Sequence, residues 1–416
     1  MKNQKFKSMN GITLIALVVT IVVLLILAGV SLNAIFSENG IIKRAQEAQN
    51  KMDQATQNDL DAINGLNELI DSKTNGTTGG NDNPSTTPKI STLVGTVVDK
   101  NTKAEDEYGN KITIPKGFKI LAHSENTTTG DVTYTYSEDN IPAVQDGIVI
   151  ENETDGNQFV WVPVGTIKNK DNTTNTITLG RYEFDSSTGT LTSTTPVQVA
   201  SVEECTKAVS INTYYQELGT FREGVDNEYE TAQNATARNL KEFISTTLAN
   251  GGYYIARFEA SKSNTKIESK YNREVLIDLA QIEAATLARE MYGDTTDYAS
   301  DLANSYAWDT AIIFVQTYSG KADYASYNES KTTGEFTATG KNNDKYCNIW
   351  DMSGNAHEWT TEYSTYSDEG YFYPCVFRGG EYWKDYSVAV YYTSYRTSED
   401  TYTIAGYSLR SILYVK

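Results

Sequence analysis

Residues 348–359 read NIWDMSGNAHEW and are the most distinctive stretch of this chain of 416 residues. Trp350 and Trp359 enclose a short loop, and each would bury a large apolar area by packing inwards. Gly354 and Asn355 are residue types that accept a positive φ, so they predict a tight turn between the tryptophans. The stretch therefore predicts a loop that two core aromatic residues hold in place.

Further short motifs lie on both sides of this loop. Residues 377–380 (FRGG), Trp383, Arg396 and residues 406–410 (GYSLR) follow it, and FVWVPV at 159–164, GYYIARFE at 252–259 and NSYAWD at 304–309 precede it. Arginines in such loops are usually buried partners of carboxylates, because guanidinium groups bind carboxylates in two-pronged pairs. We therefore expect Arg378 and Arg410 to form buried ion pairs.

Together these motifs resemble the formylglycine-generating enzyme, or sulfatase-modifying-factor, family. Its usual run is N-V-W-D-M-x-G-N-x-x-E-W, then R-G-G-S-W, a distal Arg and G-F-R. The resemblance covers residues 145–416. It implies an α+β domain with a C-type lectin-like fold, in which small twisted antiparallel sheets, a few helices and long loops form the core.

The N-terminal part predicts a membrane anchor. The segment Ile12–Phe36 contains no charged residue. As a helix it would be roughly 37 Å long, enough to cross a bilayer core of about 30 Å. Lys2, Lys5 and Lys7 precede it, which predicts a cytoplasmic N-terminus and an extracellular remainder at a bacterial cell membrane. The alternative is a signal peptide that is removed after the apolar stretch.

The residues just before this anchor resemble a prepilin-type cleavage and methylation segment. The resemblance rests on KFK at residues 5–7, Gly11, and ITLI at residues 12–15. It implies a prepilin peptidase that cuts after Gly11 to leave Ile12 as the new N-terminus, and pilus assembly machinery as a further partner. Ala16 stands where the family usually has Glu, so membrane insertion is the firmer expectation.

The sequence divides the chain into six parts. We expect a leader at 1–11, a transmembrane helix at 12–36, a helical stalk at 37–71, a flexible linker at 72–89, a β-rich lead-in at 90–144 and the lectin-like domain at 145–416. Helices are expected at 235–248, with Leu240, Phe243, Ile244 and Leu248 on one face, at 280–292 and at 305–318, and strands at 92–98, 111–115, 131–136, 147–151 and 158–164.

Composition excludes several functions. The chain has 35 Lys and Arg against 54 Asp and Glu, a net charge of −19, which argues against nucleic-acid binding. Its two histidines, His123 and His357, leave little for a His-rich zinc site, and its three cysteines are too few for a disulfide scaffold.

The cysteine positions argue against the family's enzymatic activity. That oxidase activity uses a cysteine pair after R-G-G to bind copper(I), a soft ion that prefers thiolates. Residues 381–402 contain no cysteine; Cys205, Cys347 and Cys375 lie elsewhere. We therefore predict no formylglycine generation and no catalytic residue. Whether Cys347 and Cys375 form a disulfide stays open.

The resemblance also implies a structural calcium ion. Asp351, Glu358 and the carbonyl oxygens of Gly354 and Ala356 correspond to calcium-holding positions of the family. Calcium prefers hard oxygen ligands, including backbone carbonyls, in loops of this kind. The alternative is a loop that hydrogen bonds alone keep closed.

An aromatic-rich segment near the C-terminus predicts ligand binding. Its aromatic residues alternate with Ser, Thr and Asp, as in adaptable binding loops; the candidates are Tyr382, Trp383, Tyr386, Tyr391, Tyr392 and Tyr395. The segment resembles the variable region of lectin-fold proteins that diversity-generating retroelements target. An ordinary aromatic-rich surface and core is the alternative. The predicted function is a membrane-anchored protein that binds an unknown extracellular ligand; the alternatives are a minor pilin or pseudopilin, and an enzyme of unknown class.

Overall fold

The structure is a computed structural model that describes residues 87–122, 142–193, 209–211, 215–217, 225–227, 230–232, 237–263, 266–327, 336–364, 366–368, 371–380, 393–399 and 404–416. These residues belong to the second of two compact units, Met1–Asn81 and Asp82–Lys416. The predicted leader, transmembrane helix Ile12–Phe36, stalk, most of the linker and the strand at 131–136 lie outside the described residues. Within the described ranges, no helix is long and apolar enough to cross a membrane.

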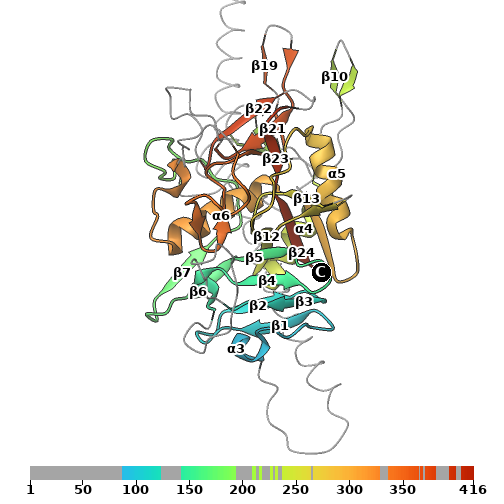
Figure 1. The fold of residues 1–416 in the computed structure, drawn as a ribbon. Coiled ribbons are helices and arrows are strands. Elements are labelled where there is room, and N and C mark those ends of the chain that lie inside the picture. Colours follow the sequence, from blue (N-terminus) through green and yellow to red (C-terminus); the bar gives the residue numbers. More distant parts are fainter. Residues whose placement is uncertain are drawn as a thin grey trace, which may run out of the picture. The chain divides into compact units, whose positions relative to one another are not determined.

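The centre of the described unit is a six-stranded antiparallel sheet, here called the first sheet (Figure 1). Its strands run in the order β15 (Tyr298–Leu302), β24 (Ser411–Val415), β12 (Gly252–Ala256), β5 (Gln158–Pro163), β4 (Val149–Asn152) and β3 (Phe118–Ile120). The two strands predicted at 147–151 and 158–164 thus form two neighbours of this sheet. The C-terminal strand β24 lies inside it, between β12 and β15.

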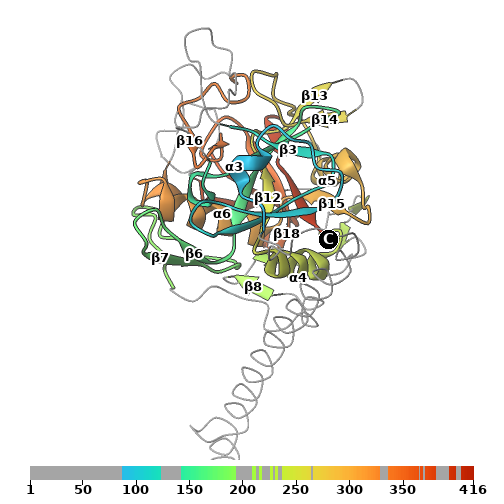
Figure 2. The ribbon, with the colours of Figure 1, turned by 90° about the horizontal axis from the view of Figure 1, so that it is seen from below.

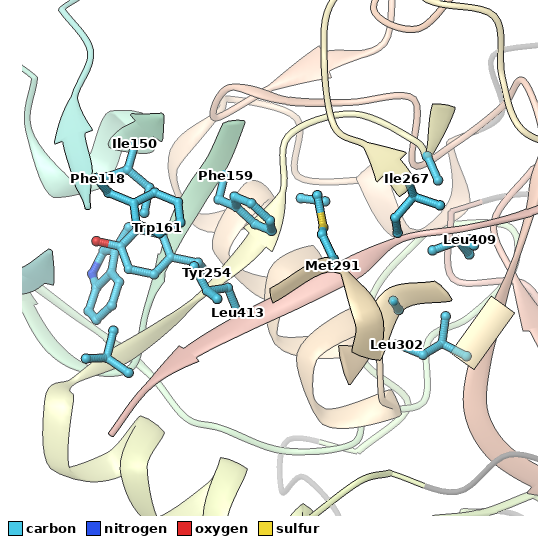
Figure 3. Close-up of a cluster of buried hydrophobic side chains, with 14 of the residues drawn as sticks. Phe118, Ile150, Phe159, Trp161, Tyr254, Ile267, Met291, Leu302, Leu409 and Leu413 are labelled. Carbon is cyan, nitrogen blue, oxygen red and sulfur yellow. The ribbon is translucent and has the colours of Figure 1, made fainter. Parts of the chain in front are cut away.

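Side chains of β5 alternate between two hydrophobic clusters. Phe159 and Trp161 belong to one cluster, whereas Val160 and Val162 belong to the other. Successive residues of a strand point to opposite faces, so both faces of the first sheet are buried. Figure 3 shows the first cluster, in which the rings of Trp161 and Tyr254 lie 4.9 Å apart. Burying each such side chain contributes about 1.5–3 kcal/mol to the hydrophobic stabilisation.

Three helices cover these faces, and all three were predicted. Helix α5 (Gln281–Tyr292) packs Ala284, Ala288 and Met291 into the first cluster. Helices α4 (Leu240–Asn250) and α6 (Ser305–Tyr318) supply the second cluster.

Three details of the helix prediction for 235–248 are wrong. Helix α4 begins later than predicted because the side chain of Asn239 caps its first turn, accepting a hydrogen bond from the Glu242 amide. It ends at Asn250, two residues later than predicted, and Gly251, with a φ of 73°, follows as its C-cap. Leu248 was expected on the buried face but is 43% exposed.

The second sheet carries the distinctive loop of the sequence. Its order is β22 (Arg396–Glu399), β21 (Cys375–Arg378), β18 (His357–Ser364), β9 (Tyr215–Glu217) and β8 (Val209–Ile211), and β23 (Tyr407–Leu409) pairs in parallel with β18. Trp359, Phe377 and Leu409 enter the same cluster as α5. The loop therefore leads directly into the core.

Short elements complete the described unit. They are α3 (Ile90–Leu93), the 3₁₀ turns η2 (Val144–Asp146) and η4 (Tyr324–Ser326), and the strand pairs β1 (Thr102–Glu105) with β2 (Lys111–Ile114), β6 (Gly165–Lys168) with β7 (Thr174–Ile177), β10 (Val225–Asn227) with β11 (Glu230–Ala232), β13 (Ser261–Ser263) with β14 (Lys266–Glu268), β16 (Lys345–Tyr346) with β17 (Ile349–Trp350), and β19 (Ser367–Asp368) with β20 (Tyr371–Phe372).

The strand predicted at 92–98 is wrong. Residues 90–93 form α3, which lies on β3 (Figure 2) and inserts the fully buried Ile90 into the first cluster. Val94 then pairs with Ile120 in a single bridge. The described elements are mostly strands, together with a few helices, and they confirm the α+β class.

Candidate functional site

The loop at 348–359 is shaped by three non-glycine residues with positive φ, of which Asn348, with a φ of 65°, comes first. Asp351 has a φ of 61° and Asn355 a φ of 76°. Gly354 was expected to share this role but is not among the positive-φ residues. Trp359 is fully buried, as predicted, and its indole N–H donates to the Leu279 carbonyl at 2.8 Å. Trp350 was also expected in the core, but it is only half-buried.

Two glycines let this loop approach β21 closely. A Cβ atom on Gly380 would lie 1.9 Å from the Ser353 carbonyl oxygen, and one on Gly379 would lie 2.9 Å from the Met352 oxygen. Both distances are too short for a Cβ atom. The close backbone contact therefore requires glycine at positions 379 and 380. The loop thus packs directly against the residues that lead into the aromatic-rich segment.

Glu358 and Arg410 form the buried ion pair that the sequence predicted for Arg410. The Arg410 guanidinium binds both carboxylate oxygens, at 2.7 Å and 2.9 Å, and neither side chain is more than 1% exposed. Arg410 also donates to the carbonyls of Ala256 and Trp350. This one arginine therefore connects β18, β12, β17 and the end of β23.

Three more buried carboxylates lie around the same loop. Asp351 accepts hydrogen bonds from the Gly340 amide at 2.7 Å and from Asn342 at 2.8 Å. Asp344 accepts from the amide and the hydroxyl of Ser353. Glu259 accepts from the Asn355 side chain and the Ala356 amide. Protein donors thus engage every one of these carboxylates.

Burial raises the pKa values of three of these carboxylates, Asp351, Glu358 and Glu259. Burial raises the pKa of Asp351 to about 7, with the nearby Asp344 adding to the effect. Burial raises the pKa of Glu358 to about 6, although Arg410 opposes the shift. Burial, Asp351 and Glu358 raise the pKa of Glu259 well above its usual range. These groups hold protons more readily than exposed carboxylates do.

In this arrangement, protein donors already engage the side chains of the predicted calcium ligands Asp351 and Glu358. Arg410 already occupies both oxygens of Glu358, and N–H groups occupy both oxygens of Asp351. In the described part of the chain, no three His, Cys, Asp or Glu side chains are grouped to hold a metal. Hydrogen bonds to protein donors hold the loop closed in this structure.

A second buried ion network joins the second sheet to α6. Arg378 binds Asp309 of α6 and, at 3.2 Å, Glu362 of β18. Arg396 binds the same two carboxylates, at 2.8 Å and 3.0 Å, and Arg181 binds Glu362 at 2.5 Å. Arg378 therefore forms the predicted buried ion pair. Its carboxylate partners could not be named from sequence.

Two carboxylates in this region have opposite pKa shifts. Burial by itself would raise the pKa of Glu362, but Arg396, Arg181 and Arg378 outweigh it and bring the pKa to about 2. Burial and the Glu362 charge raise the pKa of Glu217 to about 7. Glu217 accepts hydrogen bonds from Ser305 at the start of α6 and from Thr361. The positive charge of Arg181 opposes this rise in the pKa of Glu217 but does not outweigh burial.

The network and α6 fix both ends of residues 381–392. At the first end, Arg378 precedes the closely packed Gly379 and Gly380. At the second end, the Trp308 indole donates to the Thr393 carbonyl at 3.0 Å, and the Arg378 Nε donates to the Tyr395 carbonyl at 3.1 Å.

The η4 turn adds two contacts to this second end. The Ser394 hydroxyl donates to the Ala325 carbonyl at 2.8 Å, and the Thr393 amide donates to the Tyr327 carbonyl at 3.0 Å. The aromatic-rich segment thus begins and ends on a rigid base.

Most of the predicted ligand-binding residues cannot be placed. Tyr382, Trp383, Tyr386, Tyr391 and Tyr392 lie outside the described residues, as do the processing residues Gly11 and Ile12. Tyr395 is described and is half-buried. Its ring packs against Phe377 and His357, at 6.1 Å and 6.5 Å between centroids. Tyr395 therefore contributes to core packing.

The structure keeps the two described cysteines apart. Cys347 and Cys375 do not form a disulfide with each other. Cys347 lies at the β16–β17 turn, and Cys375 is buried at the start of β21. Burial raises the pKa of the Cys347 thiol well above its usual range. Such a thiol is protonated and a poor nucleophile at neutral pH.

Sequence reasoning missed four residues of the second network, namely Arg181, Glu217, Asp309 and Glu362. Asp309 belongs to the NSYAWD block at 304–309, which was one signal for it. The other three lie in stretches without a distinctive motif. Their contacts span between 16 and 181 residues of sequence, too far for spacing rules to reveal them.

Comparisons with known proteins give limited similarity. No family model matches the chain, and no curated protein matches its sequence. Among solved structures, CarF is 14% identical, with a TM-score of 0.28 over 40% of this chain and 87% of CarF. Treponema denticola variable protein 1 is 10% identical, with a TM-score of 0.24 over 61% of this chain and 95% of that protein. The Major Tropism Determinant M1 variant is 11% identical, with a TM-score of 0.29 over 79% of this chain and 98% of that protein. All three TM-scores are low, so the account of the fold rests on the strand order and contacts given above.

Proposed function

We propose that this chain is a membrane-anchored, outward-facing binding protein. A C-type lectin-like domain presents the aromatic-rich residues 381–392 to an extracellular ligand, without formylglycine-generating activity. The single observation that carries the proposal is the fixation of both ends of this segment on buried structure. Just before the segment, Arg378 forms a buried ion pair with Asp309. Just after it, the Trp308 indole donates a hydrogen bond to the Thr393 carbonyl.

In this arrangement, one set of residues stabilises the fold and a different set binds the ligand. The buried contacts of Arg378, Arg396, Asp309 and Glu362 stabilise the base, whereas residues 381–392 contribute none of these side chains. Binding residues commonly lie on loops that a rigid scaffold positions. Tyrosine and tryptophan supply a large contact area at a low entropic cost, which suits this role. The composition of the segment and its fixed ends support the same proposal.

The absence of the family's activity follows from the cysteine positions. Residues 381–402 contain no cysteine, so the family's copper site has no thiolates there. Cys347 lies at the β16–β17 turn, outside that segment. The test is copper-dependent oxidation of a cysteine peptide by the full chain in detergent. We expect no oxidation above the rate with copper alone, and a clear excess would refute this part of the proposal.

Anchoring and processing follow from the N-terminal sequence. We propose that Ile12–Phe36 spans the membrane and that a prepilin peptidase cuts after Gly11. Mass spectrometry of the protein from its native membrane tests both steps. We expect an N-terminus at Ile12 and protein that stays in the membrane fraction after a carbonate wash. A soluble product that lacks residues 12–36 would support a removed signal peptide instead.

The ligand is sought with the full chain in detergent on arrays of glycans and of extracellular proteins. We expect the Tyr391→Ala/Tyr392→Ala variant to lose binding to whatever the wild type binds. The matched control is Tyr366→Ala/Tyr373→Ala, which removes an aromatic pair from the β19–β20 hairpin, with ring centroids 5.9 Å apart. Equal binding by wild type and the Tyr391/Tyr392 variant would refute the aromatic binding face.

A further inference from the structure

The β8–β9 pair is attached to the second sheet by a short register. Strand β9 pairs with β18 through two residue pairs, Gln216 with Tyr363 and Tyr215 with Ser364. Strand β8 pairs with β9 and stands last in the strand order of this sheet. Because the register is so short, the side-chain contacts of β9 decide how firmly the pair stays on the sheet.

Glu217, the last residue of β9, provides such a contact. Its Oε2 accepts hydrogen bonds from the Ser305 amide at 2.8 Å and from the Ser305 hydroxyl at 2.7 Å, and its Oε1 accepts one from the Thr361 hydroxyl at 2.6 Å. The Glu217 side chain is buried. The carboxyl group thus joins β9 to the first turn of α6 and to β18. A hydroxyl group can also accept a hydrogen bond, so both partners remain usable when Glu217 is protonated.

The charged groups around Glu217 act in opposite directions. Glu362 of β18 raises the pKa of Glu217, and Arg181 lowers it. Burial is the largest cause and brings the pKa to about 7. The other charged side chains of this buried network are Asp309 of α6, Arg378 of β21 and Arg396 of β22. Glu217 therefore gains or loses its charge among buried ions.

Strand β9 also covers this ion network. Arg181 donates a hydrogen bond to the Tyr215 carbonyl at 3.4 Å, and the side chains of Tyr215 and Thr397 of β22 hydrogen-bond to each other. Tyr215 is half-buried, whereas the side chains of Arg181 and Glu362 are fully buried. Movement of β9 away from β18 would therefore open the network to water.

We propose that the β8–β9 pair is a pH-sensitive flap, which lies on α6 and β18 while Glu217 is protonated and detaches when Glu217 ionises. In the detached pair the carboxyl group meets water, where its pKa returns to the ordinary value of 4.5. Because Glu217 is the weaker acid in the attached state, a rise in pH favours detachment. Attachment is complete below pH 4.5 and weakens as pH rises to about 7. The flap does not include residues 381–392, so this proposal is independent of the binding face proposed above.

Hydrogen–deuterium exchange of the full chain in detergent, followed by mass spectrometry, tests the flap. The protection of the β8 and β9 amides is measured at pH 5 and pH 8 and corrected for the intrinsic effect of pH on exchange. We expect these amides to exchange faster than those of β5 at both pH values, because the flap opens without unfolding of the first sheet. Their protection should fall roughly 50-fold from pH 5 to pH 8, as the two pKa values of Glu217 require.

Three variants assign this pH dependence to Glu217. Glu217→Gln has no proton to lose, so its β8 and β9 amides should be equally protected at both pH values. The matched control Asp301→Asn removes another carboxylate whose pKa burial raises, and it should keep the wild-type pH dependence. Thr361→Val removes one donor to the ionised carboxylate and so raises the pKa of Glu217 further. Its protection should continue to fall above pH 7, where that of wild type levels off.

Several outcomes would overturn the proposal. Equal protection of the β8, β9 and β5 amides would mean that the pair opens only when the whole domain unfolds. Wild-type protection that is unchanged between pH 5 and pH 8 would exclude the switch, and so would the same pH dependence in wild type and Glu217→Gln. If Glu217→Gln does not fold, Thr361→Val decides instead, and levelling off at the same pH as wild type would refute the role of Glu217.

Discussion

Arg378 of β21 and Asp309 of α6 form an ion pair in which neither side chain is exposed to solvent. Helix α6 covers the first sheet, whereas β21 belongs to the second, so the pair connects the two sheets. The same guanidinium donates to the Tyr395 carbonyl, just beyond the aromatic-rich segment. This contact helps to fix the described residues on both sides of residues 381–392.

Removing Asp309 should therefore be costly. The Asp309→Asn variant leaves Arg378 and Arg396 with one fewer carboxylate in a buried site, and such losses cost about 3–5 kcal/mol of unfolding free energy. Urea unfolding of the full chain in detergent measures the difference. The exposed pair of Lys170 and Asp146 is the control, and Lys170→Met should cost about 0–1 kcal/mol. Equal costs for both variants would contradict a structural role for the network.

Glu217 should make stability depend on pH near neutrality. Its folded pKa of about 7 lies above the ordinary value of 4.5, so the folded protein keeps a proton that the unfolded chain has lost. The stability from this group is complete below pH 4.5 and falls as pH rises towards 7. The loss is about 1–3 kcal/mol at neutral pH, since one pKa unit corresponds to about 1.4 kcal/mol.

The Glu217→Gln variant, which has no proton to lose, tests this dependence. Unfolding free energies measured from pH 4.5 to 8 should fall less steeply for the variant than for wild type. Glu362 provides no such slope in this window, because its lowered pKa of about 2 keeps it ionised in the folded protein. The stability that ionised Glu362 contributes to the folded protein is instead lost as pH falls towards 2. Parallel pH profiles for wild type and variant would show that Glu217 does not titrate as described.

Gly147 should not tolerate a side chain. Its φ is 82°, and a Cβ atom there would lie 1.9 Å from the Cys347 carbonyl oxygen. We expect Gly147→Ala to lower the unfolding free energy by about 2–4 kcal/mol, through backbone strain and displacement of the β16–β17 turn. Gly109 has a similar φ of 89° with nothing within 4 Å of a Cβ atom. Gly109→Ala should thus cost only about 1 kcal/mol, and similar costs at both sites would exclude the close contact as the cause.

Chelation should leave the domain unchanged. Arg410 and backbone amides already compensate the carboxylates of the predicted calcium site. Thermal melts of the full chain with EDTA and with added calcium should have the same midpoint. A ligand that binds only the folded state, at a concentration 100 times its dissociation constant, raises the unfolding free energy by about 2.7 kcal/mol. A rise in the midpoint with calcium would therefore reveal a site that the described hydrogen bonds do not account for.

The sequence predicted the helices well because their signals are local. Helix α6 matches its predicted range, and α5 begins one residue later than expected. Apolar residues at helical spacing carry this signal, and a glycine follows each helix closely, at 251, 293 and 320. The strand predicted at 92–98 failed because Ile90 is fully buried, and its packing favoured the helix α3 over local β propensity.

The candidate site was only partly predictable, because its contacts join residues that lie far apart in the sequence. Arginine in a loop-rich region correctly indicated that Arg378 and Arg410 would be buried in ion pairs. Their partners Asp309 and Glu358 lie 69 and 52 residues away in sequence, and topology alone brings them together. The calcium ligands were predicted from a family resemblance. That resemblance does not indicate that Glu358 contacts Arg410.

The most direct test of the account is the dissociation constant of the Tyr391→Ala/Tyr392→Ala variant, measured with the full chain against the ligand that the arrays identify. The account predicts binding at least ~10-fold weaker than wild type, because aromatic residues dominate such interfaces, together with an unchanged unfolding free energy. An unchanged dissociation constant would contradict the proposal that residues 381–392 form the binding face.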